Sequence, residues 1–244
     1  MSSLLRSEPP LPVLIALWYA TAAISSISTK QTLRRFAFPI AVAVYQQLVS
    51  ILAVSLAAAC GLDGRRGYQA AGSAHAHAHP RSWTNLMPVA GCMVTSLVSH
   101  RWSLLHISVA FTTTIKTLAP VFTIVFAWLL LAQRTSAAAF ASVVPVIVGV
   151  AITSLTELDF SLVGFVGALL STVSQSLQLV LSKRLLASGE YEKSDLFYRL
   201  AMLSIVFLSL LLATFEAPRM SAQQLMPLLR APHWVVVHGL SSFT

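Results

Sequence analysis

Lys116 is the residue whose position most directly implies chemistry. It is the only residue among Asp, Glu, Lys and Arg in positions 106–133, a stretch long and apolar enough to cross a bilayer. A charged side chain at such depth costs about 3 kcal/mol even on lenient insertion scales. The side chain either faces an internal polar cavity or extends along the helix to the membrane interface. We expect the cavity, which makes Lys116 a candidate binding group for an anion.

Polar residues and a proline accompany this lysine. Thr112 and Thr113 precede Lys116 by four and three residues, so all three lie on one face of a helix. Hydroxyls beside a cation suit a phosphate, although helical threonines also commonly donate to carbonyls of their own helix. Pro120 removes the hydrogen bond that would reach the Lys116 carbonyl, and Pro145 acts in the same way in the next apolar run. Both prolines therefore predict helix kinks, whose freed carbonyls need water or a protein partner in lipid.

The sequence offers no arrangement typical of an enzyme or a metal site. It contains no Gly-rich phosphate loop and no G-x-S-x-G motif, and no His or carboxylate pair with metal-ligand spacing lies within an apolar run. Positions 75–79 alternate His and Ala, within a Gly-containing stretch at 63–81 that we interpret as a flexible low-complexity loop. We therefore predict no catalytic residue, no cofactor and no metal.

The composition indicates a protein embedded in lipid. Hydrophobic residues make up 56% of the chain and charged residues 10%, and the mean hydropathy is +0.76. Soluble domains carry about 25% charged residues. The net charge of +8 comes from basic residues that stand singly or in short groups between apolar runs, without interleaved aromatic residues, so we expect no nucleic-acid partner. The predicted fold is an all-α polytopic transmembrane helix bundle.

Apolar runs, uncharged except at Lys116, mark the expected spans. Seven such runs, whose bounds are given at the end of this paragraph, are followed by an eighth near the end of the sequence, at 234–240. We interpret the eighth run as an incomplete span. Arg101 falls between the third and fourth runs and is expected in a loop. Loop charges favour a cytosolic N-terminus, with the cluster Lys30, Arg34 and Arg35 as an exception. The seven earlier runs are 9–29, 36–62, 82–100, 102–133, 135–156, 161–182 and 200–215.

Positions 108–123, S-V-A-F-T-T-T-I-K-T-L-A-P-V-F-T, resemble the triose-phosphate transporter family, whose pattern is V-S-F-x-x-x-I-K-A-x-x-P-V-F. The likeness continues through 145–160, Gly164-Phe165 and 181–186. Near the start, Trp18-Tyr19, Ser28-Thr29-Lys30 and 36–39 resemble further family motifs, with Thr29 in place of the usual Asn. The family belongs to the drug/metabolite transporter superfamily and is close to solute carrier family 35.

The resemblance implies ten helices in two inverted five-helix repeats. The first repeat would occupy residues 1–155. A partial second repeat, of about two complete helices and the start of a third, would occupy 156–244. Family members recognise phosphate with a lysine on the fourth helix, which matches Lys116, and with a basic pair on a late helix that this sequence lacks. We place four further residues in the predicted substrate site: Thr113, Thr112, Lys30 and His100.

The implied function is secondary transport. A phosphorylated sugar or similar organic phosphate would be exchanged for phosphate or a related anion by alternating access. The alternatives are a nucleotide-sugar antiporter and a transport-inactive, truncated membrane protein with a structural or regulatory role. The expected partners are a small anionic metabolite, the lipid bilayer and a second copy in a homodimer. Because no long Ser/Arg-rich transit segment precedes the first run, we expect the Golgi or another endomembrane rather than the plastid envelope.

Overall fold

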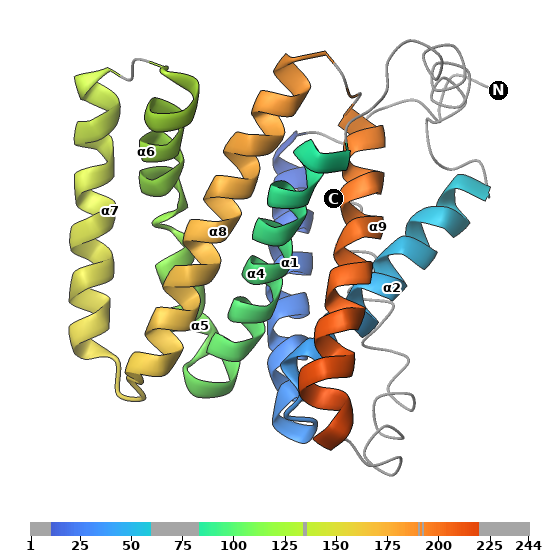
Figure 1. The fold of residues 1–244 in the computed structure, drawn as a ribbon. Coiled ribbons are helices and arrows are strands. Elements are labelled where there is room, and N and C mark those ends of the chain that lie inside the picture. Colours follow the sequence, from blue (N-terminus) through green and yellow to red (C-terminus); the bar gives the residue numbers. More distant parts are fainter. Residues whose placement is uncertain (1–10, 60–82, 134–135, 190, 192, 220–244) are drawn as a thin grey trace, which may run out of the picture.

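The computed structural model describes residues 11–59, 83–133, 136–189, 191 and 193–219, and the regular structure of these residues is entirely helical (Figure 1). The last helix continues into a π-helical turn, η1 (Leu212–Glu216), and a short 3₁₀ turn, η2 (Ala217–Arg219). The α-helices are α1 (Leu11–Arg35), α2 (Pro39–Ala59), α4 (Trp83–His106), α5 (Val109–Lys116), α6 (Ala119–Leu131), α7 (Ala137–Thr156), α8 (Leu162–Ala187) and α9 (Lys193–Leu211).

These helices form a membrane bundle. Four segments of the described chain are long and apolar enough to span a bilayer: Val109–Leu131, Ala138–Thr156, Leu162–Ala187 and Leu196–Arg219. Large apolar side chains cover much of the outer surface, as expected for a protein whose solvent is lipid. The prediction of an all-α polytopic transmembrane bundle is therefore confirmed.

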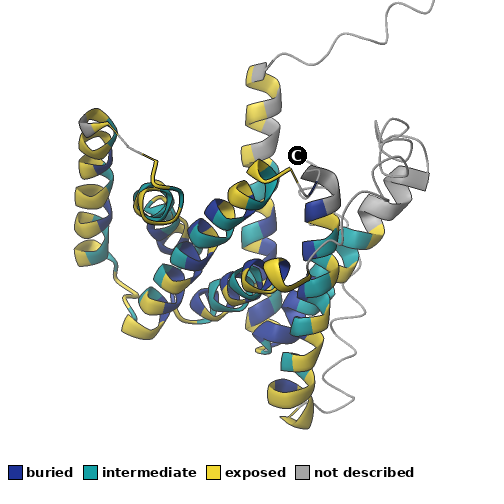
Figure 2. Ribbon diagram, turned by 45° about the horizontal axis from the view of Figure 1, so that its top comes forward, coloured by how far each residue is buried: buried dark blue, intermediate teal, exposed yellow. Residues whose placement is uncertain are grey.

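Polar residues are directed into this bundle. The α1 helix buries Ser25, Ser28 and Thr29, while α4 buries Arg101 and Ser103. Figure 2 shows that buried residues lie along α1, α4 and α8, whereas α7 exposes most of its surface. Polar groups buried among apolar helices are the arrangement expected where a polar solute meets a membrane protein.

Helices α4 and α8 form the most extensive contact between any two described helices. Ser96 Oγ donates to Ser171 O at 3.0 Å, and Ser171 Oγ donates to Ser96 O at the same distance. Gly164 and Gly167 are buried on the α8 face, where a Cβ on Gly164 would come within 2.6 Å of Ile107. Small residues and hydroxyls bring the two backbones together without any apolar driving force from lipid.

The start of α2 is bound by a carboxylate from the other end of the described chain. Pro39 occupies the first helical position, where its missing N–H is not needed. The next two amides, Ile40 N and Ala41 N, donate to Glu216 Oε1 and Oε2 at 2.9 and 2.8 Å. This contact joins η1 directly to the start of α2.

Several helices extend beyond the runs that the sequence analysis expected, and α1 and α4 are two of them. The α1 helix continues to Arg35, beyond the first uncharged run, and α4 continues through Arg101 to His106. The expectation of Arg101 in a loop is wrong, because the side chain is hydrogen-bonded inside the bundle and does not end the span. The 102–133 run is likewise not one helix, since the chain turns at Ile107 and Ser108 before α5.

The proposed repeat boundary at residues 155–156 coincides with the end of α7 and stays a prediction. The stretch 63–81, with its alternating histidines, and the eighth run at 234–240 lie outside the described residues.

Candidate anion-binding site

A helix break places Lys116 at the end of α5, within a single membrane span. The amides of Thr117 and Leu118 donate to Thr114 O and Ile115 O, both at 3.1 Å, which closes the end of α5 with tighter turns. The α6 helix then starts beside Pro120, which has no N–H to continue the ladder. Non-helical backbone at this depth persists only where protein or a polar cavity surrounds it.

Contacts with α8 hold the break in position. Ser176 Oγ of α8 donates to Ala119 O at 3.1 Å, directly at the start of α6. On the other side of the break, Ile115 and Phe111 are buried in an apolar cluster with Ala168 of α8. The Ser108 hydroxyl starts α5 by accepting from the Phe111 amide at 3.0 Å. The backbone around Lys116 is thus fixed by packing at both ends of α5.

Three basic side chains lie within electrostatic range of one another near this break. The partly buried Lys116 amine interacts electrostatically with Arg101, and His100 interacts with both cations. His100 Nδ1 is buried and has no hydrogen-bond partner within the described part of the chain. Lysine and arginine are the usual protein groups for binding phosphates. The arrangement is therefore a positively charged site within an otherwise apolar bundle.

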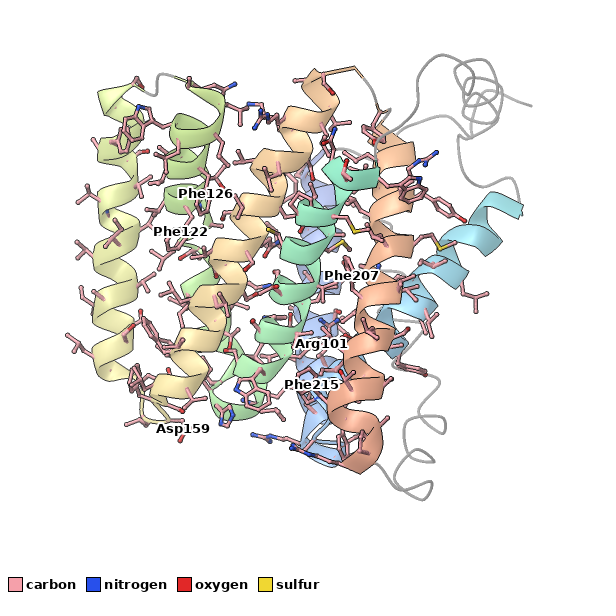
Figure 3. All side chains as sticks on the ribbon, viewed as in Figure 1. Arg101, Phe122, Phe126, Asp159, Phe207 and Phe215 are labelled. Carbon is pink, nitrogen blue, oxygen red and sulfur yellow. The ribbon has the colours of Figure 1, made fainter. Side chains whose placement is uncertain are left out.

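Arg101 is 5% exposed and is held by one residue of α2 and one of its own helix. Its Nε and Nη2 donate to Gln46 Oε1 of α2 at 3.0 and 2.5 Å, and its Nη1 donates to Leu97 O at 2.8 Å. Gln46 Nε2 in turn donates to Thr29 Oγ1 of α1 at 2.8 Å. Figure 3 shows Arg101 inside the bundle, well away from Asp159 at one end. The network fixes the guanidinium where α1, α2 and α4 meet.

The predicted threonines lie beside Lys116 in α5 but use their hydroxyl hydrogens locally. Thr112 is fully buried, and its Oγ1 donates to Ser108 O at 2.9 Å. Thr113 is exposed, and its Oγ1 donates to Ala110 O at 2.8 Å. Their hydroxyl oxygens can still accept hydrogen bonds, but the hydroxyl hydrogens already have partners. Their assignment to the substrate site stays a prediction.

Lys30 occupies a different part of the bundle. Its Nζ donates to Ile107 O at the corner between α4 and α5. Its electrostatic neighbours are Arg34, Asp159 and Glu157, at the end of α1 and in the connection between α7 and α8. Lys116 and His100 thus lie within electrostatic range of each other, whereas Lys30 lies near the end of the bundle. Its role in substrate binding also stays a prediction.

Comparison with known proteins identifies the family of this chain. A profile of the Triose-phosphate Transporter family matches residues 10–242. This chain belongs to the triose-phosphate transporter family. It is 31% identical over 172 residues to the chloroplastic triose phosphate/phosphate translocator of Brassica oleracea var. botrytis, covering 70% of this chain and 40% of that protein.

Two other relatives extend this comparison. The chloroplastic phosphoenolpyruvate/phosphate translocator 3 of Oryza sativa subsp. japonica is 32% identical over 218 residues, which is 87% of this chain and 52% of that protein. The GDP-mannose transporter GONST5 of Arabidopsis thaliana is 31% identical over 128 residues, which is 52% of this chain and 38% of that protein. This family member spans about half the length of the curated relatives it matches.

Sequence reasoning missed the burial of one charged residue of this transporter-family chain. Arg101 is the only Asp, Glu, Lys or Arg between Trp83 and His106. A charged residue within an apolar run identified Lys116. The same criterion would have identified Arg101 if that arginine had not been interpreted as the end of a span.

The α7 helix continues through Pro145. In the described ranges, no group of three or more His, Cys, Asp or Glu side chains is placed to hold a metal.

Proposed function

We propose that this protein is a secondary transporter that exchanges a phosphorylated sugar or a similar organic phosphate for phosphate. The observation that carries the proposal is the Lys116 amine at a helix break, within electrostatic range of a buried arginine. Relatives named as triose phosphate/phosphate and phosphoenolpyruvate/phosphate translocators support the same class of substrate. Because the chain spans about half of those relatives, the activity of the whole protein belongs to the proposal.

The charge of the site favours exchange over one-way transport. Uncompensated cations are costly to move through the low-dielectric centre of a membrane. A bound anion offsets the charge of Lys116 and lowers that barrier, so the loaded carrier reorients more readily than the empty one. Discontinuous helices near the midplane commonly carry the binding groups of such transporters. The break between α5 and α6 corresponds to that arrangement.

The direct test is exchange by the Lys116→Ala variant in proteoliposomes. The intact protein is reconstituted with internal phosphate, and uptake of labelled phosphate is measured. We expect at least about a hundredfold loss of exchange, which corresponds to about 2.7 kcal/mol of lost stabilisation. Lys183→Ala is the matched control, since Lys183 is an exposed lysine that contacts Gln133 at 3.3 Å. Exchange by Lys116→Ala at the rate of this control would refute the proposal.

A nucleotide-sugar antiporter is the second candidate, and similarity to the GDP-mannose transporter GONST5 favours it. The same vesicles distinguish the two, because this candidate requires uptake of a labelled nucleotide sugar. Normal membrane insertion without uptake of either substrate would instead support the transport-inactive alternative, in which the chain pairs with a second copy.

Location is part of the proposal. We propose the Golgi or another endomembrane, as the sequence favoured. Two of the three relatives described above are named as chloroplastic, so the plastid envelope is the alternative. Imaging the tagged intact protein beside markers for both compartments decides between them.

A further inference from the structure

Arg101 carries a buried charge without a counter-charge among the residues that the structure describes. The side chain is 5% exposed, and its hydrogen-bond acceptors are the amide oxygen of Gln46 and the backbone carbonyl of Leu97. No carboxylate within the described ranges forms an ion pair with it. A buried cation without an anionic partner costs several kcal/mol, of which neutral oxygens recover only part. This uncompensated charge indicates that an anion is the missing partner.

The guanidinium also has hydrogen-bonding capacity to spare. It has five N–H donors. Three contacts are formed: Nε and Nη2 to Gln46, and Nη1 to Leu97. One N–H on each terminal nitrogen is therefore without an acceptor among the residues that the structure describes. Two donors on a planar fork match two oxygens of a phosphate.

The neighbours of Arg101 reinforce this argument. Lys116 interacts with it electrostatically, and two like charges in a weakly screened interior repel each other until an anion binds between them. His100, the residue before Arg101 in α4, has a buried Nδ1 without a hydrogen-bond partner in the described part of the chain. Unpaired buried polar atoms are rare in native structures and call for an explanation. A bound oxyanion would satisfy both observations.

We propose that Arg101 is a second cationic substrate-binding residue and that, with Lys116, it selects solutes that carry a divalent oxyanion. The proposal rests on the proposed function and deepens it. Gln46 is a positioning residue, whose amide oxygen holds the guanidinium while Thr29 fixes the amide. Two cations are neutralised by one divalent phosphate group, whereas a monovalent anion leaves one charge uncompensated.

The test compares two inhibitors of similar shape and different charge. Phenyl phosphate is mostly divalent at pH 8, because the second phosphate pKa is about 6, and benzenesulfonate is monovalent. Each is added to proteoliposomes exchanging labelled phosphate at pH 8. We expect the wild-type protein to prefer phenyl phosphate by about tenfold or more, equivalent to about 1.4 kcal/mol.

Three variants separate charge from structure. Arg101→Gln should raise the KM for phosphate by about tenfold and remove most of the preference for the divalent inhibitor, whereas Arg101→Lys should retain much of that preference. Gln46→Glu supplies a built-in carboxylate to the guanidinium. It should therefore also raise the KM by about tenfold, although it strengthens the contact that holds Arg101. Arg184→Gln, at an exposed position on α8, is the matched control and should match the wild type.

The outcomes distinguish this proposal from the function on which it rests. If the wild-type protein exchanges no phosphate, the proposed function fails. If the wild type exchanges phosphate but Gln46→Glu keeps its KM and its divalent preference, Arg101 has only a structural role and the inference is overturned. Should Arg101→Gln fail to fold, Arg101→Lys and Gln46→Glu still decide the question.

Discussion

The carboxylate at the start of α2 gives a stability prediction that can be worked out from the structure. Glu216→Ala removes the acceptors of Ile40 N and Ala41 N, which are 2.9 and 2.8 Å from the carboxylate oxygens. These amides have no partner within α2, because the first turn of a helix leaves its N–H groups unpaired. Ile40 and Ala41 are only 8% and 5% exposed, so water replaces the lost acceptors poorly.

The expected loss has two parts. Two unsatisfied buried donors cost about 1.5 kcal/mol each, and removing a negative charge from a helix N-terminus costs about 1 kcal/mol. Glu216→Ala should therefore lower the free energy of unfolding by about 4 kcal/mol. Glu216→Gln keeps one acceptor and should lower it by about 2.5 kcal/mol.

Unfolding by SDS in mixed micelles, followed by far-UV circular dichroism, measures this loss. Thr214→Ala is the control, because Thr214 is exposed on the same segment and its hydroxyl donates to Leu210 O of its own helix. This control should stay within about 0.5 kcal/mol of the wild type. A loss for Glu216→Ala no larger than that of Thr214→Ala would show that water or other groups satisfy the two amides.

Two further predictions concern the contact between α4 and α8. Gly164→Ala places a Cβ 2.6 Å from Ile107 and should destabilise the protein by about 1–3 kcal/mol in the same unfolding assay. Gly149→Ala meets nothing within 4 Å and should be neutral or stabilising, so equal losses for both glycine variants would contradict the packing argument. Ser96→Ala and Ser171→Ala should each cost about 0.6 kcal/mol. Their double variant should cost less than the sum, because the two hydroxyls also contact each other at 3.4 Å and either single variant removes that contact; strict additivity would contradict the coupling.

Much of the fold and part of the site could be predicted from the sequence. The apolar runs identified the described spans because a bilayer sets the length of a crossing helix. Lys116 was identified because charge inside such a run is expensive. Pro120, four residues later, indicated irregular backbone at the same place, and the α5–α6 break lies directly before it. Each of these inferences depends on local sequence alone.

The parts that sequence could not supply depend on contacts between distant helices. Arg101 is held inside the bundle by Gln46, which lies 55 residues earlier in the chain. Without that partner, an arginine after an apolar run is most simply interpreted as the end of a span. Lys30 likewise has its acceptor, Ile107 O, 77 residues away, which places it at a helix corner. The partners of Glu216 are more than 170 residues distant.

The π-helical turn at the end of α9 keeps the buried residues of that helix on one side of it. Its buried side includes Leu200, Ser204, Leu208 and Glu216, a series spaced by multiples of four residues. In a regular α-helix, positions four apart differ by about 40°, so such a stripe would wind about 80° around the axis between Leu208 and Glu216. The five residues of the wider turn rotate less per residue and offset much of that winding. A helix that faces lipid along most of its length can thereby finish with a single acid aimed at its neighbour.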